Sequence, residues 1–159
     1  MLANGGFLVT QNVVARLASG LVGALALAGV VVTAQQKAPT IVVYKTPTCG
    51  CCTKWVEHLQ AAGFTVQTQH RDDLTIIRQT HKVPPTATSC HTALVGPYVV
   101  EGHVPAADVK RMLAEQPKIK GIAVAGMPVG SPGMEGPAPQ KYDTVAFTEA
   151  GKITVFAKH

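Results

Sequence analysis

The chain has 159 residues, with 14 Lys and Arg against nine Asp and Glu, which gives a formal net charge of +5 at neutral pH. The basic residues are spread thinly, without a lysine or arginine run, and only 5% of the residues are aromatic. This pattern argues against nucleic-acid binding, which uses clustered basic side chains. The length suits one domain with its own hydrophobic core after any leader.

A secretory signal peptide is predicted at residues 1–34. Arg16 precedes a nearly uncharged apolar run, and Val32 and Ala34 supply small residues at the cleavage site. We therefore expect cleavage after Ala34, a mature metal-binding domain of residues 35–159, a periplasmic location and no stable membrane anchor after cleavage. The alternative is an uncleaved anchor, because the apolar run falls only slightly short of a spanning helix.

Three of the four cysteines lie in Cys49-Gly50-Cys51-Cys52. The β-branched and aromatic run at residues 41–44 predicts a buried strand before them. Apolar residues at helical spacing from Trp55 to Leu59 predict a helix after them that ends near Gly63. The thiols therefore stand at a helix start, where free amides and the helix dipole stabilise thiolate. Thiolates bind soft metal ions and attack disulfides.

The rest of the chain predicts a thioredoxin-like α/β fold, with a mixed sheet and flanking helices. The expected elements are a half-exposed strand at 64–70, a helix at 74–81, a strand at about 89–95 after a proline loop, a strand at 98–101 and a helix from 105 to 117. A ferredoxin-like metal-binding domain, the alternative, would order its elements differently. Residues 118–140 are rich in glycine and proline and are predicted to lack regular structure. Residues 142–147 and 153–157 predict a closing β-hairpin.

The fourth cysteine, Cys90, begins the predicted third strand, which should run beside the first strand in this fold. It would then approach the other thiols, although a buried free cysteine also serves as a small apolar residue. A purely structural role suits the other three cysteines poorly. A bridge between Cys51 and Cys52 would close a strained ring, and one between Cys49 and Cys52 would cross-link almost no chain.

Five motifs follow one another along the mature chain. They are Cys49-Gly50-Cys51-Cys52 followed by Trp55, His81-Lys82-Val83-Pro84, Ser89-Cys90-His91-Thr92, Glu101-Gly102-His103-Val104-Pro105, and a Gly-Met-Pro segment with Met127 and Met134. Together they resemble the CopG-like copper-resistance proteins, long catalogued as a domain of unknown function. The resemblance implies a thioredoxin-like periplasmic protein that binds copper and assists copper resistance. The cysteine ligands of the family correspond to Cys49, Cys51, Cys52 and Cys90.

The chemistry of the residues favours the same metal. Four thiolates suit one Zn(II), but zinc sites space their ligands by about two to four residues, whereas Cys51 and Cys52 are adjacent. Adjacent thiolates suit Cu(I), a soft ion, and can bridge several ions, so a multi-copper thiolate cluster is our hypothesis. Met127 and Met134 offer soft thioether sulfur in the irregular segment, and the equal alternative is that they pin this loop to the domain.

The histidines are expected to be secondary. His91 should point to the strand face opposite Cys90, and His103 should hydrogen-bond backbone in a turn. His58 is expected to face solvent, His70 and His81 to lack a sulfur partner, and the terminal His159 to be mobile.

Two functions follow. The first is a periplasmic copper-binding protein that takes copper from, or passes it to, another periplasmic copper-handling protein. The second is a thiol-disulfide oxidoreductase with Cys49 as the nucleophile and Cys52 as the resolving thiol. A third reading joins them, with copper cycling between Cu(I) and Cu(II) while a partner accepts electrons. An oxidoreductase alone needs neither a third thiol nor nearby methionines.

Overall fold

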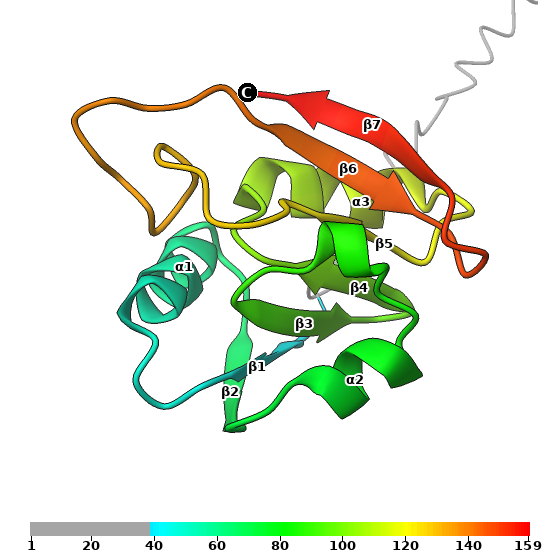
Figure 1. The fold of residues 1–159 in the computed structure, drawn as a ribbon, viewed down its shortest axis with the longest axis horizontal. Helices are drawn as coiled ribbons and strands as arrows, with labels where there is room; N and C mark the ends of the chain where they lie inside the picture. Colours follow the sequence, from blue (N-terminus) through cyan, green and yellow to red (C-terminus); the bar gives the residue numbers. More distant parts are fainter. Residues whose placement is uncertain (1–38) are drawn as a thin grey trace, which may run out of the picture. The chain divides into compact units, whose positions relative to one another are not determined.

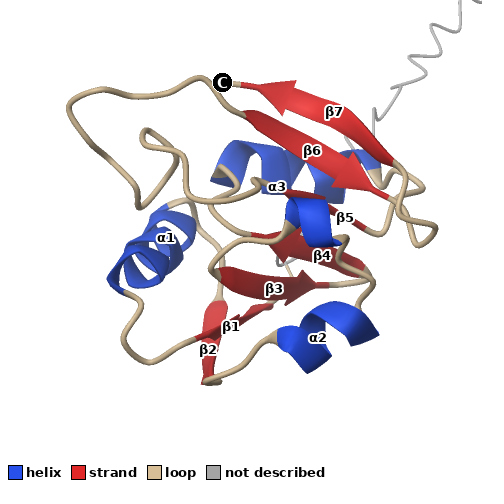
Figure 2. Cartoon of the chain, viewed as in Figure 1, coloured by secondary structure: helices blue, strands red, loops and turns tan. Residues whose placement is uncertain are grey.

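The computed structural model describes residues 39–159, and the predicted signal peptide with its cleavage site lies outside them. Seven strands form one mixed sheet in the order β2-β1-β3-β4-β5-β6-β7, with helices packed beside it (Figures 1 and 2). The elements are β1 (Ile41–Lys45), α1 (Gly50–Ala61), β2 (Val66–His70), α2 (Thr75–Thr80), the 3-10 helix η1 (Pro85–Ala87), β3 (His91–Val95), β4 (Tyr98–Glu101), α3 (Ala106–Glu115), β5 (Gly121–Ala123), β6 (Asp143–Phe147) and β7 (Ile153–Lys158).

The first seven regular elements follow the predicted thioredoxin-like order. Strand β1 pairs in parallel with β2 through the α1 crossover, and it pairs antiparallel with β3 on its other side. Strand β3 pairs antiparallel with β4, and α3 follows. The predicted α/β fold class with a mixed sheet is therefore confirmed. This topology places the β1–α1 turn beside the start of β3, where Cys90 lies.

Two hydrophobic clusters fill the two faces of the sheet. The larger joins α1 and α3 to one face and includes the fully buried Trp55, Leu59 and Met112. The smaller joins Val83 and Ala87, around η1, to the opposite face. Because side chains alternate along a strand, β4 sends Val100 to the larger cluster and Val99 to the smaller one. The two faces of the sheet thus pack against different elements: α1 and α3 on one face, and the segment around η1 on the other.

The prediction that residues 118–140 lack regular structure was wrong at their start. Residues Gly121–Ala123 form β5, which pairs in parallel with β4 and antiparallel with β6. A strand of three residues is too short to show a period of two in the sequence. Its first residue is a glycine because a Cβ at position 121 would clash with the carbonyl oxygen of Val99. The predicted hairpin, β6 with β7, is confirmed and extends the sheet.

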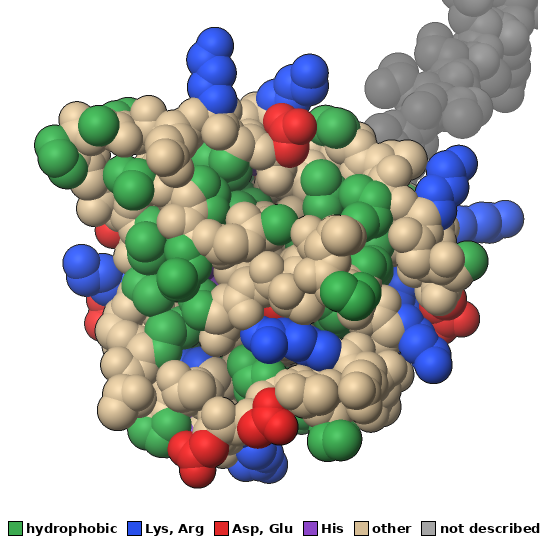
Figure 3. Space-filling model, viewed as in Figure 1, with side chains coloured by type: hydrophobic (Ala, Val, Ile, Leu, Met, Phe, Trp, Pro, Cys, Tyr) green, Lys and Arg blue, Asp and Glu red, His purple; other side chains and the backbone are tan. Residues whose placement is uncertain are grey.

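On the face seen in Figure 3, Lys and Arg side chains are scattered, most of them near the outline and some near the lower centre, without forming one patch. Within residues 39–159, no helix has the length and apolar character that crossing a membrane requires.

Candidate metal centre

The four cysteines come together at the start of α1. Cys49 is the N-cap of this helix, and Cys51 and Cys52 lie in its first turn. Cys90 approaches from the bend just before β3, so that its Sγ lies 3.4 Å from the Sγ of Cys52. All four sulfur atoms lie within 4.8 Å of one another. The prediction that Cys90 reaches the other three is confirmed by this geometry.

The cluster is half oxidised. Cys49 and Cys52 form a disulfide, whereas Cys51 and Cys90 are free thiols. The Sγ of Cys51 lies 3.5 Å from that of Cys49, so each free thiol stands beside a different sulfur of the bridge. Four thiolates require two steps. The disulfide must first take up two electrons and two protons to become two thiols, and all four thiols must then lose their protons. Four thiolates would therefore be present only in a reduced form of this site.

Two histidines adjoin the Cys90 sulfur. His103 Nε2 lies 2.9 Å from Cys90 Sγ, and His91 Nδ1 lies 3.3 Å from it. The expectation that His91 points away from Cys90 was wrong. Regular β3 begins only at His91, so strand alternation does not extend back to Cys90. His103 also bonds backbone as expected, through Nδ1 and the carbonyl oxygen of Pro132 at 2.8 Å.

Burial favours the uncharged forms of the Cys90 thiol and of both imidazoles. Burial, with the Cys51 thiol nearby, raises the pKa of the Cys90 thiol to about 12. Burial also lowers the pKa of His103 and, more strongly, that of His91, whose ring is fully buried between Trp55 and His103. Neutral imidazoles retain a lone pair, so both rings have nitrogen available to a metal. His91 Nε2 has no hydrogen-bond partner within the described residues.

The Gly-Pro-Met segment lies against this centre. It passes beside α1 in Figure 1, drawn from yellow to orange. A Cβ on Gly133 would lie 2.6 Å from the carbonyl oxygen of Cys51 and 2.9 Å from the amide nitrogen of Trp55, so the loop backbone touches the first turn of α1 directly. Met134 is half-buried and Met127 is 51% exposed. The segment therefore forms part of the wall of the site, through the backbone of Gly133.

Two other histidine expectations were wrong. His58 is half-buried and its Nε2 accepts the amide of Ala106, the first residue of α3, at 3.0 Å. His159 is held rather than free, because its Nε2 lies 2.9 Å from Asp108 and its ring stacks on Tyr142. Both contacts join segments far apart in the sequence, which local patterns do not reveal. Within residues 39–159, neither His70 nor His81 forms a hydrogen bond with a sulfur atom.

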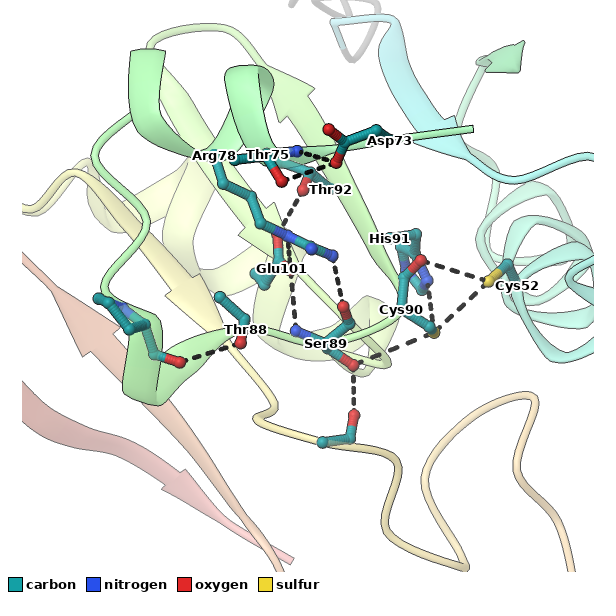
Figure 4. A network of polar contacts seen from close by, with 12 residues as sticks. Cys52, Asp73, Thr75, Arg78, Thr88, Ser89, Cys90, His91, Thr92 and Glu101 are labelled. Atoms are coloured by element: carbon teal, nitrogen blue, oxygen red, sulfur yellow. Dashed lines mark hydrogen bonds and ion pairs between the residues drawn. The ribbon is translucent and has the colours of Figure 1, made fainter. Parts of the chain in front are cut away.

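Sequence reasoning missed a buried ion pair behind Cys90, between Arg78 of α2 and Glu101 of β4. Arg78 Nε lies 3.0 Å from Glu101 Oε1, and the Glu101 side chain is fully buried. Figure 4 shows both side chains converging on Ser89, next to Cys90. The signal in the sequence was a lone carboxylate at the end of the apolar run Tyr98-Val99-Val100.

Comparison with known proteins gives the chain a family. A protein-family profile described as "Protein of unknown function, DUF411" matches residues 87–134. No curated protein sequence matches significantly. Two solved structures, described as copper resistance protein copG in forms 1 and 2, are each 41% identical to this chain. Each comparison covers 77% of this chain and 98% of the other, with TM-scores of 0.72 and 0.73. The chain therefore belongs to the family of CopG copper resistance proteins.

Proposed function

We propose that this protein binds copper in the periplasm and acts in copper resistance, with Cys49, Cys51, Cys52 and Cys90 holding Cu(I) once the bridge is reduced. The observation that carries this proposal is the gathering of four sulfur atoms within 4.8 Å of one another. Membership of the CopG family supports copper as the metal. Residues 1–34, as a cleaved signal peptide, would deliver the domain to that compartment.

Cu(I) fits the donor set better than Zn(II). Thiolates are soft ligands, and Cu(I) accepts few ligands, so one sulfur can bridge two ions. The adjacent Cys51 and Cys52 suit such bridging, whereas a single tetrahedral ion needs four well-separated directions. Cys90, from a different element, closes the group opposite the helix. A multi-copper thiolate cluster is the form of site that we propose, with His103, whose Nε2 lies 2.9 Å from Cys90 Sγ, as an additional donor at its border.

Redox conversion of copper is the finer form of the proposal. Each Cu(I) that becomes Cu(II) gives up one electron, which a periplasmic electron-accepting partner takes. Thiolate ligation favours Cu(I), and the neutral imidazole of His103 beside Cys90 moderates this preference because nitrogen also suits Cu(II).

The test is an anaerobic Cu(I) titration of the reduced residues 35–159 against a competing chelator. The wild type should take up more than one copper per chain, and Cys90→Ser should lower both stoichiometry and affinity because it removes the sulfur that closes the group. A Thr53→Ser variant, changed on the exposed side of the same helix turn, is the control and should bind like the wild type. One copper or less per wild-type chain would contradict the cluster.

The Cys49–Cys52 disulfide favours a second function, thiol-disulfide oxidoreductase. Here Cys49, at the N-cap of α1, would be the attacking thiol after reduction, since the helix start stabilises its thiolate. Weak copper uptake that ignores Cys90→Ser, together with disulfide exchange on a model substrate that needs only Cys49 and Cys52, would favour this function over copper binding.

A further inference from the structure

We propose that Arg78 and Glu101 are positioning residues for Cys90: they clamp Ser89 from the far side of the sheet and so set the Cys90 sulfur at the distance from Cys52 that the centre requires. The placement of Cys90 is a property of the metal-free fold. Its use for copper rests on the function proposed above.

The clamp holds the backbone of Ser89 at both ends. Glu101 Oε1 accepts the amide of Ser89 at 2.9 Å, and the Arg78 guanidinium donates to the carbonyl oxygen of Ser89 (Figure 4). The hydroxyl of Ser89 donates to the carbonyl oxygen of Gly126. The peptide group that joins Ser89 to Cys90 is therefore fixed before β3 begins at His91. The bend before β3 is thus held by hydrogen bonds to side chains, where a strand would be held by its neighbour's backbone.

The clamp is built on one fully buried carboxylate and a half-buried guanidinium, and both groups are hydrogen-bonded. Glu101 is fully buried and also accepts the Thr92 hydroxyl at 2.6 Å. Arg78 offers a planar fork, so one nitrogen pairs with Glu101 while another reaches the Ser89 carbonyl. A single buried carboxylate thus ties α2, β3 and β4 to one backbone segment.

The geometry of the sheet explains why the clamp lies where it does. Thr92 and Glu101 are paired neighbours on β3 and β4, and they share the face opposite α1 with Val99. His91 and Ala93 point to the α1 face, where the sulfurs are. Holding Ser89 from behind therefore fixes Cys90 without occupying the side on which the four sulfurs meet.

Gly102 packs directly against Ser89. Its φ is +72°, and a Cβ there would lie 2.5 Å from the Cβ of Ser89. The backbone of Gly102 also donates to the carbonyl oxygen of His91 at 3.0 Å. Ser89 is thus packed directly on a glycine that a larger residue could not replace without displacing it.

A metal-free assay tests the positioning. The parent protein for this assay carries Cys49→Ser and Cys51→Ser, so that only Cys52 and Cys90 remain. Their sulfur atoms lie 3.4 Å apart in the wild-type structure. Diamide removes two electrons and two protons from these thiols and becomes the hydrazine, while the thiols form a disulfide. The rate is followed by free-thiol titration and mass spectrometry. Arg78→Met and Glu101→Gln should each slow bridge formation roughly tenfold or more, because ångström-scale misplacement weakens a proximity-driven step.

The controls separate positioning from general loosening. Arg78→Lys keeps a charge for Glu101 but lacks the second arm of the fork, so it should fold and still be slower than the parent. Asp108 lies on α3, away from the sulfur atoms, and pairs with His159. Asp108→Asn removes the charge from this pair and should leave the rate unchanged. Rates are compared at temperatures well below each variant's melting point. Equal rates in the parent and all three clamp variants, or an equal slowing by Asp108→Asn, would overturn the clamp.

A second measurement links the clamp to copper. With all four cysteines present and reduced, Arg78→Lys should bind Cu(I) as Cys90→Ser does, with lower stoichiometry than the wild type. If the wild type takes up no Cu(I) but the clamp variants slow diamide oxidation, the proposed function fails and the positioning role stands. If the wild type binds several ions and Arg78→Lys binds the same number at the same affinity, the clamp has no role in the metal centre.

Discussion

His58 couples the two helices that cover the sulfur-bearing face of the sheet. Its Nε2 must be unprotonated to accept the Ala106 amide at 3.0 Å, the bond that satisfies the first amide of α3. Burial lowers the pKa of His58 below its ordinary value of 6.5, with the Glu135 carboxylate opposing part of that shift. At the scale of one residue, a histidine that is not at the metal centre makes the fold sensitive to acid.

This sensitivity is testable with His58→Gln, which retains an acceptor but cannot titrate. Because the folded pKa is depressed, the histidine's contribution to stability is full above about pH 6.5 and is lost as pH falls through the folded pKa. The melting temperature of the metal-free wild type should therefore drop more than that of His58→Gln between about pH 7 and pH 5. Melting curves in a pH series measure it, and parallel curves for the two proteins would contradict it.

Among the elements, the loop between β5 and β6 fits closely against the first turns of α1. Gly133 has a φ of +85° and touches backbone atoms of Cys51 and Trp55, which cannot move aside as a flexible side chain would. Next to it, the carbonyl oxygen of Pro132 holds His103 at 2.8 Å. The loop and the first turn of α1 therefore position each other.

Gly133→Ala should displace this loop. We expect a loss of about 2–4 kcal/mol in the free energy of unfolding, from backbone strain plus the clash, and faster alkylation of the free thiols Cys51 and Cys90. The matched control is Gly151→Ala, which has a similar φ of +78° but no atom within 4 Å of the new Cβ. Chemical denaturation and timed alkylation compare the two. Equal losses and equal alkylation rates in both variants would show that the contact does not matter.

At the scale of the described domain, the C-terminal hairpin is fastened to α3 by the last residue. The backbone of His159 exchanges hydrogen bonds with Tyr142 at 2.9 and 3.2 Å, and its ring bridges to Asp108. The far edge of the sheet is thereby joined to a helix that packs on its centre. The C-terminal hairpin is thus attached to the rest of the domain by a contact with α3 as well as by the pairing of β5 with β6.

Deleting His159 should lower the free energy of unfolding by about 1–3 kcal/mol, because the buried Asp108 carboxylate loses its partner. Urea denaturation of the metal-free protein measures the loss. Lys158→Ala, a change to an exposed neighbour on β7, should have little effect and serves as the control. A deletion variant as stable as the wild type would mean that β7 holds by its pairing with β6 alone.

The sequence by itself determined the features that depend on neighbours along the chain. The strand before Cys49, the helix after it and the closing hairpin follow from local periodicity and turn residues. The element order then predicted that Cys90 would approach the other sulfurs, since this topology sets β3 beside β1. The cysteines could be singled out because thiols at a helix start carry their chemistry with them.

Only the tertiary structure decided which polar groups meet across elements. Three contacts join residues that lie far apart in the sequence. They are the pairs Arg78 with Glu101, His58 with Ala106, and His159 with Asp108. A hydrogen bond of this kind depends on ångström-scale placement, which no residue pattern encodes locally. The orientation of His91 toward Cys90 was likewise decided by the tertiary structure. Local propensity sets the elements, whereas the packing of the two sheet faces sets the geometry around the sulfurs.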